Sequence, residues 1–441
     1  MNEDSLFDII KDCTKIFNEI KKKKNENLNT SLTNCLNNLN MLKENISQKN
    51  KEKIEENLLS ISISFIEGTK QIIELKYTKF YLNILILIKK FIEYSIFSQE
   101  KSSNLVEILS NIYNNSKTND ECQNKVLEIL QSLIFTSFFE IKFDILSNIY
   151  LLILNSFCNT NNSKNKDFKN PIRLLFTTIT EKVYKSNNLE IIIQITILIF
   201  SWYNLSLQKK IEYFGKKNSK EKSNNNEKEK EKEKDNGDAV ENIENHINFS
   251  DEIDDKLKEK VIKILNQKKN HIYIQCLSIE LLSEGFNIIH NKKEDEKNDQ
   301  IGIKFLDIFI KEKILKSFIF SLDTIKNNNS SNEEPSYYIL YLKILKFIKI
   351  ILFNYKVDYN IIQSILDVIK DNDKNQNKIS WKIKLTFEFL CNIITNYELL
   401  EKIGKWKIEL IQDIFTSINN FIDNIESIKE DKDKENKKSI V

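Results

Sequence analysis

The sequence predicts an all-α protein, an α-solenoid of armadillo- or HEAT-like helical repeats, and two observations lead to this prediction. Apolar residues recur at spacings of three and four along almost the whole chain, as amphipathic helices require. The 441 residues include only six Gly and two Pro, whereas strand-and-turn folds and α/β enzymes need Gly for tight turns and phosphate loops. Helical hairpins can instead turn on Asn, Asp, Ser and Lys, in which the chain is rich.

The periodicity predicts two series of helices joined by short polar loops, which is typical of a solenoid. The first series covers 5–24, 28–47, 51–75, 78–97, 102–115, 119–138, 142–160, 167–186 and 189–214. The second covers 252–268, 271–291, 301–312, 313–326, 336–356, 358–371, 379–402 and 407–429. Pro171 and Pro335 fall near helix starts, where a missing N–H has the least effect. No strict repeat period is present, which favours armadillo or HEAT units over tetratricopeptide repeats.

A polar segment separates the two series. Residues 216–235 are almost wholly polar, with alternating Lys and Glu, and cannot bury enough apolar area to offset the entropy of ordering. We therefore predict an N-terminal helical block at 1–215, a disordered linker at 216–248, a C-terminal helical block at 249–430 and a charged tail at 431–441.

The residues that enzymes and metal sites use are scarce. His246, His271 and His290 are the only histidines, and no two Gly lie within five residues of each other. A His-based metal site, a Ser/His/Asp triad and a Gly-rich phosphate loop are therefore not indicated. We interpret the histidines as structural and the carboxylates as solvated helix faces. The expectation is a non-enzymatic protein with no catalytic, cofactor-binding or metal-binding residues, no cofactor and no small-molecule substrate.

Charge and cysteine usage narrow the possible partners and the compartment. The net charge of +2 gives no indication of a nucleic-acid partner. The first residues, MNEDSLFDII, are acidic and lack the apolar core of a signal peptide. The cysteines contain no CxxC pair, which favours a reducing compartment. They are Cys13, Cys35, Cys122, Cys158, Cys276 and Cys391.

The lysine run, the most apolar stretches and the tryptophans each have alternative interpretations. The run Lys21–Lys24 either contacts an anionic surface or, as we prefer, flanks the C-terminus of a helix. The most apolar stretches lie at 80–97, 189–203 and 337–355, and none contains about 18 uncharged apolar residues in a row, the length that a membrane span needs. We interpret them as buried solenoid helices. Trp202, Trp381 and Trp406 are expected to be core or groove anchors.

The order of helices in two regions resembles a known family. Residues 76–92 and 123–183 resemble the dimerisation and cyclophilin-binding domain that opens the BIG-type large Arf guanine-nucleotide-exchange factors and their non-catalytic relatives, the Mon-two proteins. The matched features are the Gln123/Val126/Leu127 helix start, the Leu130–Leu133 face, the helix Asp144–Ser156, the polar break Cys158–Lys166 and the last helix Arg173–Val183.

The second region follows the polar segment and resembles the homology-upstream region of the same family, most closely that of the Mon-two type. The matched stretches are 274–289, 335–355, 358–372, 379–393 and 408–425, with Trp381 and Glu388 at positions where the family tends to have Trp and Glu. Ile383, between Lys382 and Lys384, stands where the family often has a basic residue. The Asn-Tyr-Asp-Cys box and the catalytic exchange domain are not found. The sequence also stops where a Mon-two protein would continue with more helical repeats, so we expect either a short paralogue or a truncated gene product.

The resemblance implies a scaffold for vesicle-mediated transport. Such a protein is cytosolic and is recruited peripherally to trans-Golgi or endosomal membranes. There it binds a second copy of itself, an Arf-like GTPase or a partner of the Dopey type. Composition and periodicity fit an armadillo/HEAT adaptor from another pathway equally well, and only the order of the matched segments favours the transport scaffold. A regulator of a small GTPase that has no sharp motif is a weaker alternative.

Overall fold

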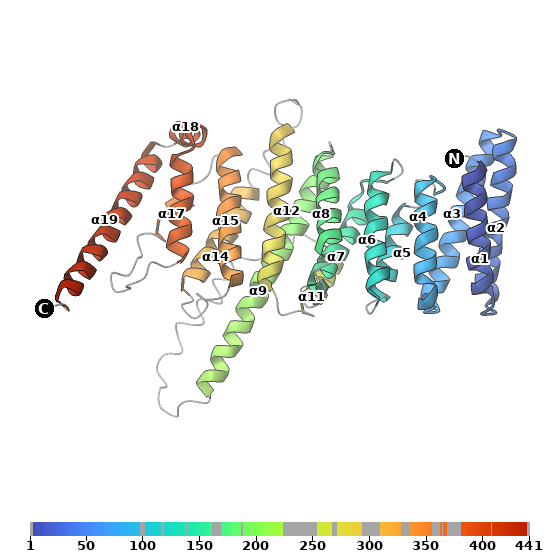
Figure 1. Cartoon of the computed structure of the whole chain (residues 1–441), viewed down its shortest axis with the longest axis horizontal. Helices are drawn as coiled ribbons and strands as arrows, with labels where there is room; N and C mark the ends of the chain where they lie inside the picture. The colour runs from blue at the N-terminus through green and yellow to red at the C-terminus, as the bar shows by residue number, and fades with distance from the viewer. Residues whose placement is uncertain are drawn as a thin grey trace. The chain divides into compact units, whose positions relative to one another are not determined.

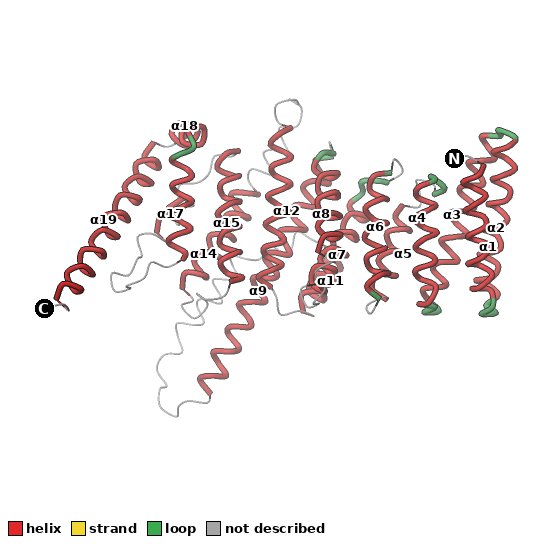
Figure 2. Tube along the Cα trace, viewed as in Figure 1, coloured by secondary structure: helices red, strands yellow, loops and turns green. Residues whose placement is uncertain are grey.

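A computed structural model describes most of the chain. The described residues are 3–97, 102–115, 119–136, 139–160, 169–186, 188–223, 254–266, 271–292, 309–327, 335–354, 362–363, 365–367, 381–406 and 408–438. These residues form helices joined by turns and contain no strand (Figure 2), so the all-α prediction is confirmed. Contacts divide the chain into two compact units, Met1–Ile195 and Thr196–Val441.

Unit 1 is built from two rows of neighbouring helices (Figure 1). In one row α4 packs against α1 and α6, and α6 packs against α8; in the other, α5 packs between α3 and α7. Contacts of α5 with α6 and of α7 with α8 join the rows, and α2 packs on both α1 and α3. The elements are α1 Glu3–Lys21, α2 Glu26–Ser47, α3 Lys51–Glu74, the 3₁₀ turn η1 Thr78–Phe80, α4 Tyr81–Glu93, α5 Ser102–Asn115, α6 Asp120–Phe135, α7 Phe143–Thr160, α8 Lys169–Tyr184 and the start of α9 Leu189–Ser223.

In unit 2, α15 packs against α12, α14, α17 and α18, and α19 packs against α17 and α18. Besides the rest of α9, the elements are α11 Asp255–Asn266, α12 His271–Lys292, the π-helical segment η5 Ile310–Leu315, α14 Lys316–Asn327, α15 Pro335–Asn354, α17 Trp381–Ile394, α18 Tyr397–Trp406 and α19 Ile408–Lys438.

The cores of both units are rich in aromatic rings. In unit 1, the Phe65 ring on α3 lies 6.5 Å from that of Phe17 on α1, 4.6 Å from Phe91 on α4 and 6.0 Å from Phe97, centroid to centroid. In unit 2, ring contacts link α9, α14, α15 and α12. The pairs are Tyr203–Phe318 at 4.7 Å, Phe318–Phe347 at 5.1 Å and Phe286–Phe347 at 5.9 Å.

Asn residues cap the N-termini of several helices. The side-chain Oδ1 of Asn25, Asn50 and Asn119 accepts a hydrogen bond from the backbone N–H three residues later, at 2.9, 3.3 and 3.0 Å. Asn188 and Asn396 do the same for α9 and α18, at 3.2 and 3.0 Å. Each bond satisfies one of the N–H groups that a helix start leaves unpaired.

Lys and Ser occupy the left-handed positions that end helices. Lys49, Lys76 and Ser95 have φ of 57°, 53° and 53°, and no described Gly has positive φ. After α2, the Asn50 N–H donates to the Asn45 carbonyl at 3.1 Å and the Lys49 N–H donates to the Ile46 carbonyl at 3.0 Å, which together form a Schellman motif. The same pair of bonds follows α3 and α4. Of the four residue types predicted to replace Gly in the hairpins (Asn, Asp, Ser and Lys), these turns confirm Asn, Ser and Lys.

Replacing a left-handed Lys by Gly should stabilise the protein. A side chain at φ of 57° is unfavourable because its Cβ approaches the carbonyl oxygen, and Gly lacks that atom. After allowing for the greater freedom of Gly in the unfolded chain, Lys49→Gly should raise the free energy of unfolding by roughly 0.5–1 kcal/mol in denaturant titration. Lys43→Gly, inside α2, is the control and should lower it by about 1 kcal/mol. A loss of stability from Lys49→Gly would contradict the cap assignment.

Three predicted boundaries are wrong. The single helix expected at 379–402 is two, because Asn396 caps α18 after α17 has ended at Ile394. The break expected between 312 and 313 is absent, since the helix continues through the π-helical segment Ile310–Leu315 into α14. The helix expected to end at 214 continues to Ser223, because Lys and Glu are good helix formers beyond the apolar face.

The domain boundaries differ in detail from those expected. The contacts divide the chain at Ile195/Thr196, within α9, whereas the sequence predicted a division at 216–248. Residues 216–223 are helical, and the rest of the predicted linker lies outside the described residues. Residues 431–438 of the predicted charged tail belong to α19. The predicted helices at 301–312 and 358–371 lie largely outside the described residues.

Candidate functional site

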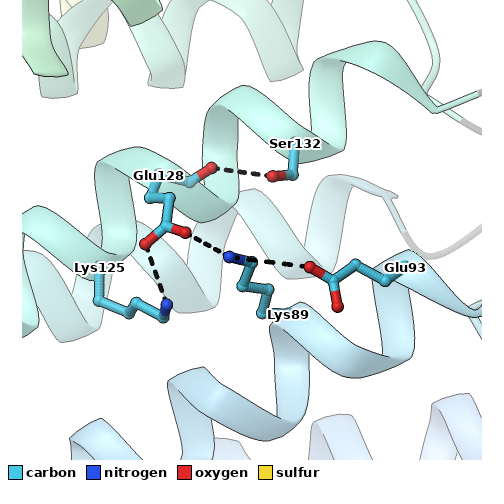
Figure 3. A network of polar contacts seen from close by, with 5 residues as sticks. All are labelled: Lys89, Glu93, Lys125, Glu128 and Ser132. Carbon is cyan, nitrogen blue, oxygen red and sulfur yellow. Dashed lines mark hydrogen bonds and ion pairs between the residues drawn. The ribbon is translucent and has the colours of Figure 1, made fainter.

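A network of polar contacts on unit 1 joins α4 and α6. Lys89 Nζ on α4 forms an ion pair with Glu128 Oε1 on α6, and it also lies 3.7 Å from Glu93 Oε1 (Figure 3). Lys125 Nζ lies 2.9 Å from the second carboxylate oxygen of Glu128. The Ser132 hydroxyl donates to the Glu128 backbone carbonyl at 3.2 Å. We name these five residues the α4–α6 network.

The pKa shifts of Glu128 and Lys89 are those of a stable ion pair. Burial raises the pKa of Glu128, but hydrogen bonds from Lys89 and Lys125 outweigh burial and hold this pKa below its usual value. The hydrogen bond to Glu128 raises the pKa of Lys89. Neither pKa is shifted toward 7, where the pKa of a general acid or base would lie. The network therefore ties α4 to α6 and is not arranged for proton transfer.

The next residue along α4, Lys90, pairs with a carboxylate on the other neighbouring helix of the row, α1. Lys90 Nζ forms an ion pair with Asp12 Oδ2 on α1, and the hydrogen bond to Asp12 raises the pKa of Lys90. Consecutive lysines thus hold α4 to both neighbours in its row. Lys70 Nζ on α3 lies 3.2 Å from Glu107 Oε2 on α5 in the other row, and Lys343 on α15 pairs with Glu280 on α12 in unit 2. Lysine–carboxylate ties between neighbouring helices therefore occur in both units.

The Glu128 carboxylate should make a small, pH-dependent contribution to stability. Its folded pKa is below the unfolded value, so its stabilisation is present above the unfolded pKa and is lost as the pH falls through the folded pKa. Because the side chains are partly exposed, Glu128→Gln should reduce the free energy of unfolding at pH 7 by no more than about 1 kcal/mol, and by less at high salt. A double-mutant cycle with Lys89→Met isolates the pair. A difference between wild type and Glu128→Gln that grew on acidification would contradict the assignment.

Burial disfavours the reactive thiolate form of Cys13, Cys35 and Cys276. Cys13, Cys35, Cys122, Cys158 and Cys276 are buried. Burial raises the pKa of Cys13 and Cys35, and it raises the pKa of Cys276 to about 12. Such thiols remain protonated and unreactive at neutral pH. No group of three or more His, Cys, Asp or Glu side chains suited to a metal ion occurs within the described residues.

The histidines and tryptophans differ in burial and in whether the structure describes their side chains. His271 begins α12 and is half-buried, the side chain of His290 is not described, and His246 lies outside the described residues. Trp202 is fully buried, as expected of a core anchor. The Trp381 ring lies 5.5 Å from that of Tyr338 and 5.6 Å from that of Tyr341 on α15. The side chain of Trp406 is not described.

Large apolar side chains are exposed on both units. Phe135 at the end of α6 is 70% exposed, and Tyr397 at the start of α18 is 79% exposed. Leu174 on α8 and Ile408 on α19 are 53% and 61% exposed. Aromatic side chains are enriched at the centres of protein interfaces, so Phe135 and Tyr397 are the stronger candidates among these residues. The sequence could not identify them, because the same residue types at the same spacing also fill the core.

Two helices contain long apolar segments. Leu189–Gln208 of α9 and His271–Ile289 of α12 are long and apolar enough to cross a membrane, by length and composition alone. The first of them includes the stretch 189–203, which we interpreted as a buried solenoid helix, and the second was not among the apolar stretches named above. Of their residues, 72% and 61% are buried within the protein, as in core helices of soluble proteins. Two such helices are weak evidence for a membrane span.

The stretches that carry the family resemblance map onto described helices. In unit 1 they cover η1 with α4, α6, α7 and α8; in unit 2 they cover α12, α15, α17 and α19. Residues 358–372 lie mostly outside the described residues. On α17, Ile383 is buried and Glu388 is exposed. No family model, curated protein or solved structure matches the chain.

Proposed function

We propose that this chain is a non-enzymatic protein-binding scaffold of the armadillo/HEAT type, acting in vesicle-mediated transport between the Golgi and endosomes through Arf-type GTPases. The observation that carries the scaffold assignment is the pair of helix rows in unit 1, α1–α4–α6–α8 and α3–α5–α7. Each helix contacts its neighbours in the row, so the core is continuous and the outer helix faces form an extended ridged surface. Exposed residues such as Phe135 supply anchors for a partner.

The pathway rests on the family resemblance. Matched segments occur in the same order on both sides of the polar segment, and the family they resemble is built around Arf-type GTPases. The proposed partners are a second copy of the chain, an Arf-like GTPase and a Dopey-like protein. The proposed location is the cytoplasm, with peripheral attachment to trans-Golgi or endosomal membranes.

Affinity purification of the tagged chain from its own cells, with identification of bound proteins by mass spectrometry, tests the proposal. Arf-like GTPases, coat regulators or a Dopey-like protein are the expected partners. The matched control is Phe65→Ala, which removes a ring from the aromatic core of unit 1 and so destabilises its fold. Proteins that bind the folded surface should not be recovered with this variant. Nuclear-transport, cytoskeletal or ribosomal partners without trafficking proteins would overturn the pathway. Accelerated nucleotide release from an Arf-family GTPase would overturn the non-enzymatic assignment.

A further inference from the structure

Two loops that are distant in the sequence meet at one end of unit 1. The first joins α1 to α2 and includes Lys22, Lys23 and Lys24, and the second joins α3 to α4 through Tyr77. The Lys23 Nζ lies 5.7 Å from the centroid of the Tyr77 ring, so the loops are neighbours. The lysines gathered here, which we name the lysine tip, are Lys21, Lys22, Lys23, Lys24, Lys76 and Lys79.

The lysine tip carries charge that its surroundings do not neutralise. Within the described residues, none of its six ammonium groups lies at ion-pair distance from a carboxylate, whereas Lys70, Lys89 and Lys90 along the helix rows are each paired. The stretches 19–26 and 74–79 contain these six Lys and three Glu, which leaves a formal charge of 6 − 3 = +3. Five of the six lysines are exposed, and Lys21 is half-buried.

The backbone holds the lysine tip in place. Lys24 and Lys76 occupy left-handed positions with φ of 54° and 53°. After α3, the Tyr77 N–H donates to the Ile72 carbonyl and the Lys76 N–H donates to the Ile73 carbonyl, both at 3.0 Å. The chain between the helices is therefore fixed by hydrogen bonds, and the backbone that carries the lysines needs little ordering before it meets a partner.

We propose that the lysine tip is a docking site for the surface of an anionic phospholipid bilayer. The preferred interpretation of Lys21–Lys24, a helix C-terminus flanked by Lys, accounts for Lys21 at the end of α1. It does not account for Lys76 and Lys79, which belong to another loop. Leu75 is 37% exposed beside these lysines, and Tyr77 presents a ring with a polar end. A turn that combines lysines with an exposed Leu and a Tyr suits the headgroup region of a membrane.

This site gives the proposed scaffold a membrane-facing end. The role of the site in the cell rests on the proposed function. Each lysine near an anionic leaflet adds only a modest amount to the free energy of membrane binding. The lysine tip should therefore bind reversibly, and stable attachment should need a second signal. Binding to lipid vesicles depends on the tip alone, whereas capture of protein partners depends on the scaffold surface. Failure of one test is therefore distinguishable from failure of the other.

The test is cosedimentation of the full chain with phosphatidylcholine vesicles that either contain or lack phosphatidylserine. We expect binding only to the anionic vesicles, and loss of binding at high salt because the Debye length shortens. The triple variant Lys22→Glu, Lys23→Glu, Lys76→Glu should bind at least about tenfold more weakly. The matched control, Lys49→Glu, Lys51→Glu, Lys53→Glu, reverses three exposed lysines at the opposite helix ends and also includes one left-handed position.

The control variant should bind like the wild type, and both variants should show the wild-type melting temperature by circular dichroism. Equal binding to neutral and anionic vesicles, or an equal loss in both variants, would overturn the proposal. Polyglutamate or RNA bound in preference to anionic vesicles, with the same loss in the first variant alone, would also overturn it, since the tip would then serve an acidic polymer.

Discussion

Replacing Phe65 by Ala should destabilise unit 1 by about 3–5 kcal/mol, which is a large part of the stability of a typical domain. The Phe65 side chain is 1% exposed, and its ring contacts those of Phe17, Phe91 and Phe97. Truncation removes contacts with α1, α4 and the turn after α4 simultaneously. Because those helices are fixed by other contacts, the space cannot close fully and a cavity is left.

Two measurements check this result. The unfolding transition should move to lower denaturant concentration, and amide hydrogen exchange should become faster in α1, α3 and α4. Phe135→Ala is the matched control, because this ring is 70% exposed, and its effect should stay within about 0.5 kcal/mol. Similar small effects of both substitutions would mean that the four rings are not packed as described.

Gly68→Leu should be the second most damaging substitution, lowering the free energy of unfolding by about 1–3 kcal/mol or more. Gly68 lies in α3, at the contact with α2. A Cβ atom there would lie 3.0 Å from Leu32 Cδ2 and 3.6 Å from both Leu32 Cγ and Ser31 Cβ. Leu32 is 1% exposed, so its side chain has little room to move. The larger residue must therefore push the two helices apart.

A compensating substitution and a second glycine make this prediction specific. Leu32→Ala combined with Gly68→Leu keeps the total side-chain volume similar and should recover part of the loss. Gly404→Leu in α18 is the control, because among the described side chains the Cβ there would meet only the flexible end of Ile411, at 3.1 Å from Cδ1. If Gly404→Leu proved as destabilising as Gly68→Leu in denaturant titration, close approach of α2 and α3 would not explain the effect.

Local chemistry made much of the fold predictable from the sequence. The scarcity of Gly and the helical spacing of apolar residues predicted an all-α chain, and Asn at helix starts such as Asn50 satisfies the N–H groups that helices leave unpaired. The break at Asn396 was missed because the apolar spacing continues across it, so only the capping hydrogen bond to the Leu399 N–H reveals the boundary.

The polar clusters could not be predicted in the same way. Lys89 pairs with Glu128, and Lys23 lies over Tyr77, and both contacts join residues far apart in the sequence. In a chain where Lys is the common surface residue, nothing in the local pattern separates a lysine that ties two helices from one that faces solvent. Those assignments depend on which helices become neighbours, and periodicity does not specify this.

The row arrangement of unit 1 has a consequence for how the protein is made. From α1 to α8, each helix packs mainly on helices one or two elements away in the sequence, and the contact of α1 with α4 spans three elements. Chains dominated by such local contacts fold quickly, because short loops close with little loss of entropy. Each helix can therefore find its permanent neighbours soon after it leaves the ribosome. Early segments need not wait, with apolar surface exposed, for the distant end of the chain to be synthesised.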